Sequence, residues 1–321
     1  MKQEEILQEQ LQSASELVEK GDNAYQSSDY ISALDSYHQA LVIYNKINIA
    51  YPKRIDTGSL QGKIESADQK LGLHIVEEDK KFGFADKNGQ IVIPCKWSDI
   101  GEFSEGLSIV KGEHQLCGFI NYCGELVIPC VYKDANSFLD GMACVESNAE
   151  NDFDWQYTFY IDHDNCNIAS KFELLAHQIK AVYKASVLAR FGKYKEAAES
   201  IQPALGTLDP NPMMKLLTYY SLGEQYDKLI ERCHKILKLS EHSELCVMAD
   251  IALADCYEYG HGVEADLMSA FNYYNAIRLE NNISDDDYNL VEKFLDRHPE
   301  LKELPEVQNS LNITFDDEED Y

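Results

Sequence analysis

Basic residues are scarce in this 321-residue chain, which has 28 Lys and Arg against 56 Asp and Glu and a net charge of −28. The charge is −4 for residues 1–72, −10 for 73–172 and −14 for 173–321, so none of the three segments is basic. Nucleic acids and anionic membrane surfaces attract clusters of Lys and Arg. We therefore expect no nucleic-acid or membrane partner, and the acidic balance favours a basic or neutral protein partner.

Long apolar runs are also missing. No window approaches 18 uninterrupted apolar residues, and the polar start MKQEEILQEQLQ lacks the apolar core of a signal peptide. The nine cysteines are odd in number and irregularly spaced. We therefore expect a cytoplasmic protein whose cysteines are reduced and mostly buried.

Motifs of known catalytic and cofactor sites are absent, namely the P-loop, the Rossmann fingerprint, G-x-S-x-G and H-E-x-x-H. In Asp162-His163-Asp164 a histidine between two carboxylates could act as a general base or a metal ligand. The tripeptide occupies the turn position that residues 86–88 hold in the first repeat, which favours a solvated hairpin turn. Cys117, Cys123 and Cys130 lack the close pairs of a zinc site, which favours core thiols over a redox-active group. We expect no enzyme activity, no catalytic residues, no cofactor and no metal.

The most informative feature of the sequence is a motif that occurs twice. Residues 81–94 read KFGFADKNGQIVIP and residues 116–129 read LCGFINYCGELVIP, an offset of 35 positions. Phe103-Ser104-Glu105-Gly106 recurs as Phe138-Leu139-Asp140-Gly141 at the same offset. Repetition with such a period predicts one supersecondary unit copied along the chain, with each copy packed on its neighbour.

Residues 73–172 alternate with period 2 and predict short strands separated by turns. The turns at 86–89, 121–124 and 162–165 occupy equivalent positions, which predicts a third, altered copy. Ser170 there replaces Pro94 and Pro129, and an acidic insertion near 148–154 lengthens the period to 41 (121 to 162).

This segment resembles the WG or KWG repeat family, in which an aromatic residue and a glycine precede a hairpin ending in V-I-P and an F-S-E-G turn. Phe82-Gly83 and, more loosely, Cys117-Gly118 stand at the family's Trp-Gly position. The resemblance implies a β-repeat module and carries no catalytic residues.

The segments on either side have helical periodicity. Residues 13–44 resemble a tetratricopeptide (TPR) hairpin, with Gly21, Ala33 and Ala40 as its small residues and a break at 27–29, and residues 59–71 predict a capping helix. Residues 188–205 resemble a second such hairpin, and residues 252–277 resemble a Sel1-like repeat. The glycine-rich loop of that repeat accounts for Gly260 and Gly262 better than a phosphate-binding loop does.

We therefore expect an α+β protein with a TPR-like hairpin and cap (1–72), a WG-repeat β module (73–172), a TPR/Sel1-like α-solenoid (173–310) and an acidic tail (311–321). Repeats of these kinds favour a non-catalytic scaffold or adaptor that binds a protein or peptide in the solenoid groove or at the β module. The candidate groove residues are Tyr219, Tyr220, Tyr257, Tyr259, Glu258 and Glu264.

Two alternatives remain open. One is a small-molecule-sensing or enzymatic β module, which a pocket lined by His114 or His163 with clustered carboxylates would favour. The other is a structural subunit that assembles with copies of itself.

Overall fold

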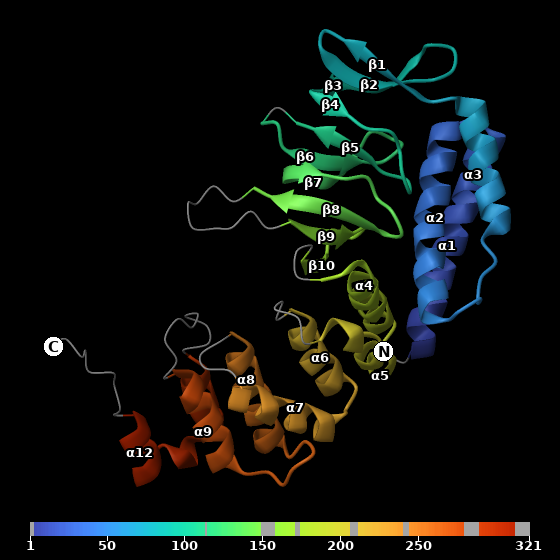
Figure 1. Ribbon diagram of the computed structural model, residues 1–321. Helices are drawn as coiled ribbons and strands as arrows, with labels where there is room; N and C mark the ends of the chain where they lie inside the picture. Colours follow the sequence, from blue (N-terminus) through green and yellow to red (C-terminus); the bar gives the residue numbers. More distant parts are fainter. Residues whose placement is uncertain are drawn as a thin grey trace. The chain divides into compact units, whose positions relative to one another are not determined.

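A computed structural model describes residues 3–112, 114–148, 158–170, 174–205, 211–239, 244–278 and 289–311 (Figure 1). Helices precede and follow a central β region, which confirms the predicted α+β layout. The chain divides into two compact units, Met1–Asp209 and Pro210–Tyr321. Residues 312–321 of the predicted tail and 149–154 of the acidic insertion lie outside the described residues.

The first unit begins with three helices, α1 (Gln3–Gln26), α2 (Tyr30–Ala50) and α3 (Gly58–Leu71). Asp29 caps α2 by accepting a hydrogen bond from the Ser32 N–H at 3.1 Å, at the break that the sequence predicts. A Cβ added at Gly21 would lie 2.5 Å from Cδ1 of Tyr37. The small residue is therefore needed for α1 and α2 to approach closely.

The described residues of the β region form ten strands, and all of their pairings are antiparallel. They form a sheet of order β1-β2-β3 and a sheet of order β10-β9-β8-β7-β6-β5-β4. Their bounds are β1 (His74–Glu78), β2 (Lys81–Ala85), β3 (Ile91–Trp97), β4 (Asp99–Ile100), β5 (Ser108–Lys111), β6 (Cys117–Ile120), β7 (Leu126–Ala135), β8 (Met142–Ser147), β9 (Thr158–Asp162) and β10 (Asn167–Ser170).

The repeated glycine has the same structural role in the first two copies. A Cβ added at Gly83 would lie 2.8 Å from the Cys95 nitrogen, and one at Gly118 would lie 2.8 Å from the Cys130 nitrogen. The strand pairing is irregular at both places, because the partner strand bulges toward the glycine. In the third copy Phe159 stands in place of this glycine and pairs with Ser170. The predicted third hairpin is therefore present, but its two strands do not approach as they do at Gly83 and Gly118.

The described part of the first unit ends with the helices α4 (Ala176–Arg190) and α5 (Tyr194–Ser200) and the 3-10 helix η1 (Gln202–Ala204). The loop between α4 and α5 contacts the N-terminal helices. Lys193 Nζ donates to the Ala50 carbonyl at 2.8 Å, at the C-terminal end of α2, and Gln3 donates to the Gly192 carbonyl at 3.0 Å. The first part of the expected solenoid segment is thus packed into the first unit.

The second unit is helical in its described residues. Its elements are α6 (Asn211–Leu222), α7 (Tyr226–Leu239), α8 (Glu244–Tyr259), α9 (Leu267–Arg278), α11 (Leu290–Arg297), the 3-10 helix η2 (Pro299–Leu301) and α12 (Pro305–Leu311). Phe271 and Phe294 are fully buried in the core that α8, α9 and α11 share. None of the helices within the described ranges is long and apolar enough to cross a membrane.

Candidate functional site

The three equivalent hairpin turns of the β region share one local design. The first residue of each turn is Asp86, Asn121 or Asp162, and its side-chain oxygen accepts backbone N–H groups of the turn at 2.9–3.0 Å. The fourth residue, Gly89, Gly124 or Asn165, has a positive φ. This geometry leaves the second residue of each turn facing the helices.

The first two turns dock on α3 and α2. The Lys87 N–H donates to the Leu71 carbonyl at the end of α3, at 2.9 Å. Tyr122 stacks on His38 of α2 with ring centroids 5.3 Å apart, and on Phe103 at 4.0 Å. Hydrophobic side chains of the helices and the β region therefore share one core.

The third turn is held by cations from two helices. Arg190 of α4 donates to both Asp162 and Asp164, and Lys46 of α2 donates to Asp164 at 2.7 Å. Burial alone would raise the pKa of Asp164, but the bond to Lys46 holds it below its ordinary value. Asp162 is fully buried. The prediction of a solvated turn is therefore wrong for Asp162, whereas Asp164, Asn165 and Cys166 of the same turn are exposed, as that prediction requires.

The two F-x-x-G turns dock on the same helices. A Cβ added at Gly106 would lie 2.7 Å from Cβ of His38, and one at Gly141 would overlap the hydroxyl of Tyr183 on α4. Both glycines have a positive φ. The turns are also joined to each other, since the Gly141 N–H donates to Glu105 at 3.0 Å. Glycine is required at both positions by the backbone and by the helix beside it.

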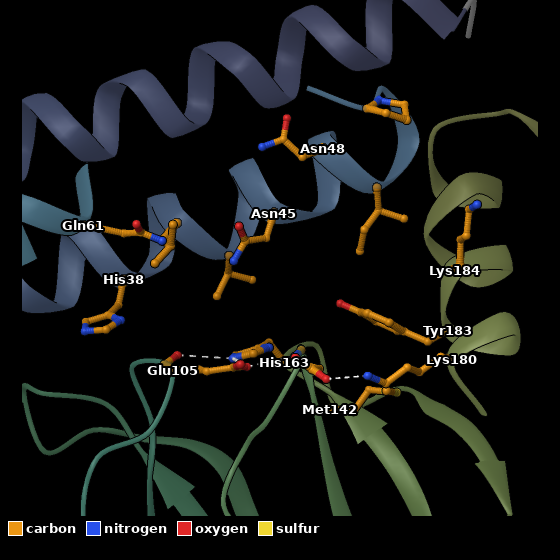
Figure 2. Close-up of a pocket in the computed structure, with 16 residues that line it drawn as sticks. His38, Asn45, Asn48, Gln61, Glu105, Met142, His163, Lys180, Tyr183 and Lys184 are labelled. Atoms are coloured by element: carbon orange, nitrogen blue, oxygen red, sulfur yellow. Dashed lines mark hydrogen bonds and ion pairs between the residues drawn. The ribbon is translucent and has the colours of Figure 1, made fainter. Parts of the chain in front are cut away.

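A pocket of about 850 Å³, here called the junction pocket, lies between these turns, α2 and α4. Figure 2 shows its three walls: α2 with Asn45 and Asn48, α4 with Tyr183 and Lys184, and the β turns with Glu105 and His163. Asn48 is held in place by two bonds of 2.9 Å to the backbone of Ile55. The other lining residues are His38, Leu41, Val42, Ile49, Pro52, Gln61, Asp140, Gly141, Met142 and Lys180.

Two neutral histidines line the junction pocket. Burial lowers the pKa of His163 to about 4, with a further contribution from the positive charge of Lys46, and burial lowers the pKa of His38 to about 4 as well. Nε2 of His163 lies 3.3 Å from the Glu105 carbonyl. Its Nδ1 is buried and has no hydrogen-bond partner among the described residues. This nitrogen has almost no accessible surface, so an occupant of the pocket could contact the ring but not Nδ1.

Helix α4 brings three cations and no carboxylate to the turns. Arg190 pairs with the third hairpin turn, and Lys180 pairs with Asp140 at 2.7 Å. Lys184, one helical turn after Lys180, lines the pocket and has no ion-pair partner within the part of the chain that the structure describes. Tyr183 precedes Lys184 on the helix, and burial raises the pKa of its hydroxyl to about 12, so the hydroxyl stays protonated and can donate a hydrogen bond.

The residues predicted for a solenoid groove lie in the second unit, and several of them are internal. Tyr219 and Tyr220 are 6% and 7% exposed. Glu258 is 7% exposed, and both of its oxygens accept bonds of 2.8 Å from Arg297. Burial alone would raise the pKa of Glu258, but these bonds lower it to about 2.

The other three groove candidates are more accessible. Tyr259 is 56% exposed, Glu264 is exposed and Tyr257 is half-buried against Tyr273. Of the six candidates, Tyr259 and Glu264 remain as surface groups of the second unit, and partner binding by any of them stays a prediction.

Other candidates contribute no chemistry to the junction pocket. His114 is exposed and is not among the lining residues. All nine cysteines are free and five are buried, and burial raises the pKa of Cys117 and Cys130. Thiols with raised pKa values carry less of the reactive thiolate. The described residues include no group of three or more possible metal ligands.

The pocket-lining residues of α2 and α4 were not predicted from the sequence. One signal was available: residues 176–190 contain Lys180, Lys184 and Arg190 without a single carboxylate, in a chain of net charge −28. A basic helix in an acidic chain predicts ion pairs with acidic turns, but the sequence does not say which turns it meets.

Comparison with protein-family models matches residues 82–111 and 118–149 to the WG containing repeat. These ranges are the first two copies of the motif, which confirms the predicted WG-repeat part of the chain. No curated protein and no solved structure matches the chain significantly. The assignment of the helical segments to the TPR and Sel1-like families stays a prediction.

Proposed function

We propose that this protein is a non-catalytic adaptor that binds a peptide segment of a partner protein in the junction pocket. The observation that carries the proposal is the pocket itself, whose walls come from both helical segments and the β turns of the first unit. An occupant would contact α2, α4 and the repeat turns together. Binding would therefore depend on the packing of the β module against its helices.

The lining of the pocket suits a peptide better than an apolar small molecule. Small-molecule sites are lined mainly by hydrophobic and aromatic groups with a few polar ones. Here nine of the sixteen lining residues are amides, charged groups or histidines, with Asn45 and Gln61 exposed at the rim. Extended peptides have many backbone donors and acceptors, and polar side chains along a groove satisfy them.

The groups of the pocket also fit binding without reaction. Glu105 accepts a backbone N–H, Asp140 is paired with Lys180, and the two histidines remain neutral. A general base works best with a pKa near the operating pH. Histidines with pKa values near 4 are weak bases, so binding explains their placement better than catalysis does.

Capture from a cell lysate by the wild-type chain and by Val42→Trp tests the proposal. Val42 lies on the pocket wall of α2, and an indole there would occupy part of the pocket. We expect wild type to retain a stoichiometric partner, and Val42→Trp to lose it while keeping the thermal midpoint within a few degrees. Equal retention by both chains would exclude the junction pocket as the binding site.

A small-molecule sensor is the second candidate, because the pocket contains His163 together with Glu105 and Asp140. Its volume of about 850 Å³ is within the usual range of small-molecule sites. Native mass spectrometry of the purified chain separates the two candidates. A bound compound of low mass that Val42→Trp lacks would favour the sensor over the adaptor.

A further inference from the structure

We infer that the junction pocket recognises a carboxylate of the bound peptide, with Lys184 as its ionic partner. The inference rests on the proposed peptide-binding function and adds the chemistry of the occupant. Two groups carry it: the unpaired ammonium of Lys184 and the phenolic hydroxyl of Tyr183, both from residues that line the pocket.

Helix α4 holds one cation that the β turns leave unpaired. Its other two cations each meet a carboxylate of the turns: Lys180 meets Asp140, and Arg190 meets Asp162 and Asp164. Lys184 lies between them on the helix, is exposed and lines the pocket, and Figure 2 shows its side chain running along α4. Its charge has no carboxylate partner among the described residues, so an occupant can supply one.

The surroundings of Lys184 favour an anionic oxygen. Tyr183 and Asn45 line the same pocket, and neither side chain has a hydrogen-bond partner in the described part of the chain. Since the Tyr183 hydroxyl stays protonated, it can donate to an oxygen. The pocket thus offers an ammonium, a hydroxyl and an amide as donors, while its own carboxylates are engaged: Asp140 accepts from Lys180 and Glu105 accepts from the Gly141 N–H.

Three mixtures of synthetic hexapeptides test this inference on the full chain labelled with ¹³C at its methionine methyl groups. The first mixture has randomised neutral residues and a free C-terminus, the second is the same with an amidated C-terminus, and the third is amidated with one Glu. The signal of Met142, a pocket residue, reports binding. Lys184→Met is compared with Lys195→Met, which removes an exposed lysine of α5 outside the pocket.

We expect the first mixture, or the third if the carboxylate comes from a side chain, to shift Met142 in wild type and in Lys195→Met. Lys184→Met should weaken this binding about tenfold, as expected for loss of a charged hydrogen bond. Equal binding of all three mixtures, or full binding by Lys184→Met, would overturn the carboxylate and leave the peptide site. A Met142 signal that no mixture shifts would overturn both.

Discussion

Replacement of Arg190 by Met is the perturbation that best tests how the β module is held to its helices. Arg190 is the only residue of α4 that contacts both Asp162 and Asp164 among the described ion pairs. Met keeps most of the aliphatic stem and removes the charge. The result is a buried Asp162 without its cation, in a turn that the helices cover.

The expected cost depends on the surroundings of Asp162. Breaking a buried ion pair by removing one partner costs about 3–5 kcal/mol. The side chain of Asp162 is 1% exposed, but it also accepts two backbone N–H groups at 3.0 Å, and the side chain of Arg190 is 32% exposed. These bonds and this exposure reduce the loss, so we expect Arg190→Met to lower the free energy of unfolding by about 2–3 kcal/mol.

Asp162→Asn supplies the matched variant, because Asn121 occupies the same position in the second copy and its side chain makes the same kind of turn bond. The amide keeps an acceptor for the backbone and removes the charge. The double variant Asp162→Asn/Arg190→Met should therefore be about 1–2 kcal/mol more stable than Arg190→Met alone. Lys195→Met, an exposed lysine of α5, should change stability by less than about 0.5 kcal/mol.

Urea unfolding followed by the fluorescence of Trp97 measures these values for the first unit, in a background where Trp155 is Phe. Trp97 is 8% exposed and belongs to β3, so its emission reports the β module. A loss of less than about 0.5 kcal/mol in Arg190→Met would refute the reasoning. So would a double variant that loses the sum of the two single losses.

Three further predictions concern pH, backbone and the second unit. The pKa of His163 is about 4 in the folded chain and about 6.5 when unfolded, so the unfolded state alone takes up the proton as pH falls between these values. His163 alone should therefore lower stability by up to about 1.4 kcal/mol per pH unit in that window, and urea titrations should show a smaller slope for His163→Gln but not for the exposed His114→Gln. Gly141→Ala should cost about 1–3 kcal/mol because of its φ of 82° and the Tyr183 hydroxyl beside it, whereas Gly62→Ala, with open space in α3, should raise the thermal midpoint. Glu258→Gln removes the charge that Arg297 binds and should destabilise the second unit by about 1–3 kcal/mol, measured by calorimetry. The same variant should leave peptide affinity unchanged, because Glu258 lies outside the junction pocket.

The repeats were the part of the fold that the sequence predicted best. A copied turn such as Phe103–Gly106 is visible because both its glycine and its spacing recur, and each glycine has a local backbone requirement. The α1–α2 break was predicted for the same reason, since Asp29 caps α2 with its own side chain. Local geometry leaves local signals in a sequence.

The pocket could not be predicted because its residues come together only through packing. Asp162 looked like a solvated turn residue by analogy with Asp86, and the analogy held for the turn but not for its burial. The difference is that Arg190 of α4 pairs with Asp162, and Lys46 of α2 pairs with Asp164 in the same turn. These contacts join residues 28 and 118 positions apart, and contacts at such separations leave no local signature in a sequence.

Exposure of helix residues was the weakest sequence prediction. Tyr219 and Tyr220 of α6 were predicted to line a groove, yet both are packed inside the second unit. A tyrosine has both an apolar ring and a polar tip, so its presence does not separate core from surface. The burial of Glu258 depends on Arg297, which lies 39 positions later.

The most direct test of peptide binding in the junction pocket places a photo-crosslinking amino acid at Asn45, an exposed residue of the pocket wall on α2, and at Lys195 as a control. Irradiation in lysate, digestion and mass spectrometry then identify what each position contacts. We predict that position 45 crosslinks to one peptide segment of a partner protein, that position 195 does not, and that Val42→Trp abolishes the crosslink. Crosslinks of equal yield at both positions, or none at position 45 from a chain that still captures its partner, would contradict peptide binding in the junction pocket.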